Sequence, residues 1–170
     1  QTPSLARKVL FLDALAADES MLAWKCTITR KRRILIDFEG GRSQLDEDSA
    51  TRELHHLSRE FHTLHQDLSD WEEQLEFLLK THHQFFKAYE EVNALNRGRP
   101  SLTFIPTTED SLDYLLSRCR IFRRWVENYR DRTKIRIDLL FHLANQKESR
   151  TNLEIADLTA KVAQQTQRDS

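Results

Sequence analysis

The chain has 170 residues, about the size of one domain. Hydrophobic residues make up 39% and charged residues 31%, a lean apolar share that suits long helices packed along a narrow seam better than a compact globule. The net charge of −1 gives no general case for nucleic-acid binding. No stretch approaches the ~18 consecutive apolar residues of a membrane span, and no signal peptide is visible.

Glycine and proline divide the chain. The 3 Gly and 3 Pro fall only at Pro3, at Gly40-Gly41 and between residues 96 and 106. This distribution predicts a single helical domain over 1–170, with helices at about 4–38, 45–95 and 108–168 and a linker at 96–107. At 1.5 Å per residue the helices would span about 50, 75 and 90 Å. Gly40-Gly41 is typical of a helix C-cap followed by a turn.

The second segment carries the clearest pattern. Apolar residues recur with alternating spacings of three and four, which predicts a helix with a coiled-coil seam. The exception in this series is His82, and a polar residue in a seam can fix the register at a cost in stability. The seam comprises Leu54, Leu57, Phe61, Leu64, Leu68, Trp71, Leu75, Leu78, His82, Phe85, Tyr89 and Val92.

The first and third segments have related seams. In the first segment the seam is interrupted by Lys31 and otherwise contains Leu10, Ala14, Ala17, Met21, Trp24, Ile28, Leu35 and Phe38. The third begins with a plausible N-cap at Thr107-Thr108 and continues through Leu112, Leu116, Cys119, Phe122, Val126, Tyr129, Thr133, Ile137, Leu140 and Ala144. Beyond Asn145 the pattern divides into two stripes, which suggests contacts on two sides. The first stripe is Leu153, Ala156, Ala160 and Ala163, and the second is Ile155, Leu158 and Val162.

Charge supports an antiparallel arrangement. The first segment has 7 basic and 4 acidic residues (+3), the second 4 and 12 (−8), and the third 12 and 9 (+3). A fold-back at residues 96–106 would place positions 67–76 near 128–137, so that Asp67, Asp70, Glu72, Glu73 and Glu76 meet Arg130, Arg132, Lys134 and Arg136. We therefore expect an all-α, elongated, three-helix antiparallel coiled-coil-like bundle with a long C-terminal helix.

No catalytic, cofactor-binding or metal-ligating residue can be assigned. The seven histidines include His62 and His65 on one helix face, but a third zinc ligand at a defined spacing is missing. There is no glycine-rich phosphate loop and no nucleophile paired with a base, so we do not expect an enzyme. The basic run from Arg118 to Arg136 is interpreted as structural, since an acidic partner helix is available. Cys26 and Cys119 share no short spacing and are interpreted as buried apolar residues in a reducing compartment.

The third segment resembles fungal CorA-like magnesium transporter proteins. The resemblance lies in residues 125–133 (WVENYRDRT) and 145–170, where Asn152, Ile155, Ala156 and Thr159 match an N-x-x-I-A-x-x-T-like stretch. It is most specific over 111–170, and over the first two helices it is architectural only. The pore motif Gly-Met-Asn is absent, because the sole methionine is Met21, between Ser20 and Leu22.

The resemblance implies a cytosolic stalk that leads into the first transmembrane helix of a homopentamer, with Mg²⁺ as the transported or regulatory ion. The pore helices would follow Ser170, so we expect a piece of a membrane protein that lacks its transmembrane part. The α/β regulatory domain of the family is absent or precedes Gln1. No metal-binding residue of the family can be carried over. The main alternative is a helical scaffold or protein-interaction module without a transport role, and a third is an all-α metal enzyme.

Overall fold

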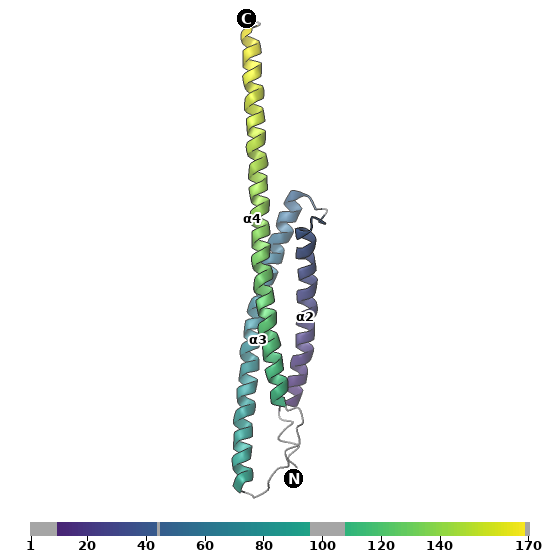
Figure 1. The fold of residues 1–170 in the computed structure, drawn as a ribbon, viewed down its shortest axis with the longest axis vertical. Coiled ribbons are helices and arrows are strands. Elements are labelled where there is room, and N and C mark those ends of the chain that lie inside the picture. The colour runs from purple at the N-terminus through teal and green to yellow at the C-terminus, as the bar shows by residue number, and fades with distance from the viewer. Residues whose placement is uncertain (1–9, 44, 96–107, 169–170) are drawn as a thin grey trace.

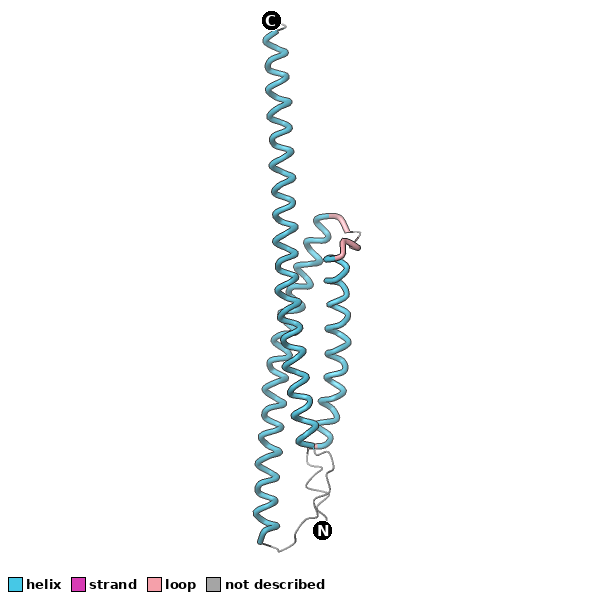
Figure 2. Tube along the Cα trace, in the orientation of Figure 1, coloured by secondary structure: helices cyan, strands magenta, loops and turns pink. Residues whose placement is uncertain are grey.

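The computed structural model describes residues 10–43, 45–95 and 108–168, and all regular structure within these ranges is helical. The helices are α2 (Phe11–Glu39), α3 (Glu47–Leu95) and α4 (Thr108–Arg168). They alternate in direction in an elongated bundle, and the second half of α4 projects beyond it (Figure 1 and Figure 2). The predicted all-α antiparallel bundle with a long C-terminal helix is confirmed. Residues 4–9 and the linker 96–107 lie outside the described residues.

The core lies where α3 and α4 pack along their predicted seams. The buried side chains of α3 include Leu54, Leu57, Phe61, Leu64, Leu68 and Leu75, and those of α4 include Leu112, Leu115, Leu116, Cys119, Phe122 and Val126. The rings of Phe61 and Tyr129 lie 5.8 Å apart between centroids. Leu115 is outside the predicted seam, yet it is buried because α4 packs against both α2 and α3.

Helix α2 packs mainly on α4 and touches α3 at few places. Its buried residues are Ala14, Ala17, Met21, Ile28 and Leu35, all members of the predicted seam. Lys31 interrupts that seam, and its ammonium group pairs with the carboxylate of Glu60 on α3. The interruption is therefore a polar link between α2 and α3.

The end of α2 has the predicted glycine cap. Gly41 has a φ of 64°, a left-handed conformation that an L side chain rarely adopts. The Gly41 N–H donates to the carbonyl of Phe38 at 3.2 Å, and the Arg42 N–H donates to that of Asp37 at 2.9 Å. These two hydrogen bonds satisfy carbonyls that the last helical turn leaves without partners.

Two arginines of α4 also bind this end of α2. Arg136 Nη2 donates to the carbonyl oxygens of Phe38 at 2.9 Å and Glu39 at 3.0 Å. Arg132 holds the Glu39 carboxylate with two hydrogen bonds, one of them from Nε to Oε1 at 2.9 Å. The C-terminus of a helix carries partial negative charge, so both guanidinium groups stabilise it.

The predicted register between α3 and α4 is wrong. Residues 67–76 lie beside the part of α4 around Cys119, whose Sγ–H donates to the Leu68 carbonyl at 3.3 Å. Arg120, and not a residue of 128–137, pairs with Glu72. Within the predicted partner stretch, Arg132 and Arg136 bind the end of α2 instead. Exposed charges contribute little to register, and the fit of apolar side chains into the opposing seam decides it.

The actual register leaves part of α3 beyond the start of α4. Glu109, in the first turn of α4, lies beside His83, so the last three turns of α3 extend past that point. Phe85 and Val92 were predicted to be seam residues, but they are 43% and 57% exposed. At the other end of the bundle the predicted seam residue Ala144 is exposed as well.

Candidate functional site

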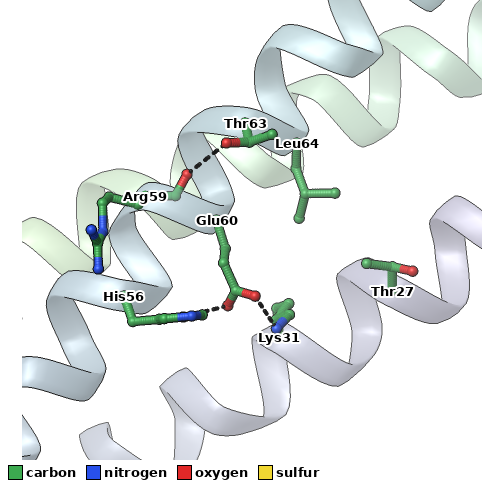
Figure 3. A pocket seen from close by; sticks show the side chains of 7 residues that line it. All are labelled: Thr27, Lys31, His56, Arg59, Glu60, Thr63 and Leu64. Atoms are coloured by element: carbon green, nitrogen blue, oxygen red, sulfur yellow. Dashed lines mark hydrogen bonds and ion pairs between the residues drawn. The ribbon is translucent and has the colours of Figure 1, made fainter.

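A shallow pocket of about 460 Å³ lies between α2 and α3. Figure 3 shows that Glu60 is at its centre, with Lys31 approaching from α2 and His56 from its own helix. His56 Nδ1 lies 3.2 Å from Glu60 Oε2. Thr63 donates its hydroxyl hydrogen to the Arg59 carbonyl at 3.2 Å. Lys31 and His56 therefore both engage the Glu60 carboxylate, and the pair of Lys31 with Glu60 ties the two helices together.

Six of the seven histidines lie on α3, and His142 lies on α4. Among the described residues, His82 and His83 are the histidines that lie close to a carboxylate of another helix. His83 Nε2 lies 2.7 Å from Glu109 Oε1, whereas the buried His82 has its Nδ1 3.9 Å from Oε2 of the same residue. The predicted seam position of His82 is confirmed, since it is 2% exposed. Across the described residues, no group of three or more His, Cys, Asp or Glu is placed to hold a metal ion.

The basic residues of α4 pair mostly within the chain. Arg120 donates to Glu72 and Glu76 at 2.8 and 2.6 Å, and Arg123 Nη1 lies 3.2 Å from the second oxygen of Glu72. Arg118 reaches Asp18 of α2 at 3.3 Å. The hydrogen bonds that Arg120 donates to the Glu72 and Glu76 carboxylates raise its pKa. These contacts confirm the structural interpretation of much of the basic run.

The two cysteines differ. Cys119 is fully buried, as predicted, and burial raises the pKa of its thiol to about 11, with the Glu72 charge adding to the effect. The same prediction is wrong for Cys26, which is exposed. Cys26 lies between the seam positions Trp24 and Ile28, so its side chain points away from the helices that cover the seam.

The projecting part of α4, residues 141–168, exposes large apolar side chains that neither of the other described helices covers. The side chains of residues 141–167 are all exposed, including Leu153 at 72%, Leu158 at 61% and Val162 at 62%. Lys147 still reaches Glu47 of α3 at 3.4 Å. Farther along, Arg150 pairs with Glu154 at 3.3 Å and Lys161 with Asp157 at 2.6 Å, both within α4 itself.

Both predicted stripes lie on this projecting part. At 100° per residue, the stripe Leu153, Ala156, Ala160, Ala163 and the stripe Ile155, Leu158, Val162 point roughly 150° apart around the helix axis. A single partner helix covers only one face of α4, so two apolar faces in these directions fit two neighbours. Both stripes are exposed, so the contacts on two sides that the sequence suggested stay a prediction.

Comparison with known protein families, curated proteins and solved structures found no match. Within the described residues, none of the three helices combines the length and apolar composition that crossing a membrane requires.

Proposed function

We propose that the chain is the cytosolic helical stalk of a CorA-like divalent-cation transporter. The observation that carries this proposal is the division of α4, whose first half packs in the bundle while its second half projects with exposed apolar stripes. A continuous helix transmits displacement along its axis, because its backbone hydrogen bonds resist stretching. In this role the bundle anchors one end of α4, and the projecting end leads to the membrane.

The proposal includes a homo-oligomer of the kind the family resemblance implies, a pentamer around a pore. In a ring, each projecting helix has a neighbour on either side, and both stripes are covered. Mg²⁺ enters as the transported ion, and no residue of the described chain is assigned to bind it.

The coding sequence that follows Ser170 gives the first test. Two apolar spans of about 20 residues with Gly-Met-Asn between them support the stalk function. A polar continuation, or a further repeat of the helical bundle, contradicts it and supports the scaffold function.

A helix-breaking insertion tests the mechanical role in the parent protein. Two glycines inserted between Glu148 and Ser149 break α4 just beyond the ion pair of Lys147 with Glu47 of α3. We expect this insertion to uncouple the bundle from the pore and to alter Mg²⁺ uptake into proteoliposomes. The matched control places two glycines after Gly41, in the turn that follows α2. Equal uptake by both insertion variants and the wild type contradicts the role.

A second candidate is a helical interaction module. The observation that favours it is an open groove between α2 and α3, which is independent of the projecting part of α4.

A further inference from the structure

The groove between α2 and α3 opens near the start of α2. There α2 rests on α4 and has few contacts with α3, which leaves a space of about 670 Å³ between the two helices. The residues lining the space come from one turn of α2 and two turns of α3: Asp13, Ala16, Ala17, Asp70, Trp71, Glu73, Gln74, Phe77 and Leu78. We refer to this region as the α2–α3 groove.

The floor of the α2–α3 groove is apolar. Trp71 and Leu78 pack against the core and are partly buried, whereas Phe77 is 67% exposed. The indole N–H of Trp71 is buried, and no acceptor in the described part of the chain receives its hydrogen. Phe77 is exposed beside two apolar side chains that pack against the core. Covering this surface with another apolar group would lower the free energy.

The rim of the groove is acidic. Asp13, Asp70 and Glu73 are exposed, and none of them forms an ion pair with a cation in the described residues. Other carboxylates nearby differ in this respect, since Asp18 pairs with Arg118 and Glu76 with Arg120. Among the residues that the structure describes, the rim therefore carries negative charge without a paired cation.

We propose that the α2–α3 groove binds a basic amphipathic helix from another polypeptide. A groove between two helices accepts a third helix in the geometry of a four-helix bundle, with an apolar face on Trp71, Phe77 and Leu78. Lysine or arginine side chains flanking that face then pair with the unneutralised carboxylates of the rim. This binding is independent of the stalk function, and its failure leaves that proposal unchanged.

The test uses the whole chain and a synthetic 18-residue peptide with leucine on one helical face and lysine on the other. Its binding is measured by the fluorescence anisotropy of a label on the peptide, at low and high salt. The control peptide has glutamate in place of lysine. We expect the basic peptide to bind and the acidic peptide not to, with affinity falling as salt screens the rim charges.

Two pairs of variants locate the site. Phe77→Ser should weaken binding about tenfold, because the helix loses the apolar contact that would bury this ring. Phe141→Ser on α4 is the matched control, since Phe141 is equally exposed at 66%, and it should leave affinity unchanged. Asp70→Asn combined with Glu73→Gln should weaken binding several-fold and flatten its salt dependence, whereas Asp138→Asn combined with Glu148→Gln should not.

Equal affinities for the Phe77→Ser and Phe141→Ser variants would overturn the proposal. So would tight binding of the acidic peptide. A third outcome would also overturn the proposal. The peptide would not bind, and sedimentation would show that the chain associates with itself unless Phe77 is replaced by serine. The groove would then be assigned to a second copy of the chain. All four variants change exposed residues, so circular dichroism should show native helix content in each.

Discussion

Arg120 Nε donates a hydrogen bond of 2.8 Å to Glu72 Oε1, and this pair joins α4 to α3 in the middle of the bundle. Glu72 is 8% exposed, while the Arg120 side chain is 48% exposed. The second carboxylate oxygen lies 3.2 Å from Arg123 Nη1, near enough for charge attraction but not aligned for a hydrogen bond. The buried Glu72 carboxylate therefore faces two guanidinium groups, Arg120 and Arg123, and both of them remain in contact with water.

This asymmetry predicts unequal effects of substitution. Glu72→Gln should lower the free energy of unfolding by about 1–2 kcal/mol, because it removes the charge from one hydrogen bond and one ion pair. Arg120→Gln should cost less than about 1 kcal/mol, since Glu72 keeps Arg123 and water screens the exposed guanidinium. Urea denaturation followed by circular dichroism gives both values. A larger loss for Arg120→Gln than for Glu72→Gln would contradict this assignment.

Replacing His82 should change the free energy of unfolding in the opposite direction. Its Nδ1 is buried and has no hydrogen-bond partner among the described residues, a condition that destabilises the folded state. His82→Leu should leave the free energy of unfolding unchanged or raise it by up to about 1 kcal/mol. His83→Leu is the control, because His83 is exposed and lies 2.7 Å from Glu109. If His82→Leu lowers the free energy of unfolding more than His83→Leu does, the buried Nδ1 of His82 does not destabilise the folded state.

The two cysteines should react at different rates. The Cys119 thiol is buried and its pKa is raised to about 11, so at pH 8 it is protonated and shielded. Titration of the native chain with a thiol reagent should therefore label one cysteine, Cys26. The Cys26→Ser variant should show no rapid labelling until urea unfolds it. Rapid labelling of that variant under native conditions would mean that the seam opens around Cys119.

Asp46 predicts a pH-dependent contribution at the start of α3. Its Oδ2 accepts a hydrogen bond from the Ser49 N–H at 3.4 Å, and the pKa of Asp46 is lowered, chiefly by the hydrogen bond from the Ser49 side chain. A lowered folded-state pKa stabilises the chain above the unfolded value of about 3.9 and stops doing so as pH falls through the folded-state value.

The Asp46→Ala variant should consequently be less stable than the wild type at pH 7, and the difference should vanish in strong acid. Thermal melts between pH 2 and pH 7 measure it. Asp46→Asn serves as the control, because an amide oxygen caps a helix without titrating. A stability difference for Asp46→Ala that is constant across this range would rule out the ionised cap.

The two stripes of α4 predict how the chain associates. Ile155→Glu with Leu158→Glu, or Leu153→Glu with Ala160→Glu, should each stop a ring from forming, and the remaining stripe would support at most a dimer. Asn152→Glu with Thr159→Glu adds the same charge on a face between the stripes and should not disturb assembly. Sedimentation velocity over a range of concentrations distinguishes these cases. If one stripe can be charged without effect, only the other is an interface.

The helices and their buried faces followed from the sequence, because alternating spacings of three and four keep one face turned toward a partner. Leu54, Phe61 and Leu68 on α3, and Phe122 and Val126 on α4, are buried as their spacing indicated. Gly40 and Gly41 end α2 for an equally local reason, since Gly41 adopts a left-handed conformation.

The register and the roles of individual arginines did not follow. Many offsets between an acidic and a basic helix place opposite charges side by side, so charge alone does not select one. Arg132 and Arg136 bind the end of α2, a contact that depends on how α2 lies on α4 rather than on any pattern within α4. The α2–α3 groove likewise arises because α2 rests on α4 and hardly touches α3, which side-chain spacing along one helix does not encode.

The projecting part of α4 should be less stable locally than the part that packs in the bundle. Its backbone hydrogen bonds are held by helix propensity and a few local ion pairs, whereas those of the packed half are held by the core. Amide hydrogens from about residue 148 onward should exchange with deuterium many times faster than those between 112 and 133. A partner that docks there must also suppress this fraying, so the ordering of the helix would be coupled to the strength of the contact.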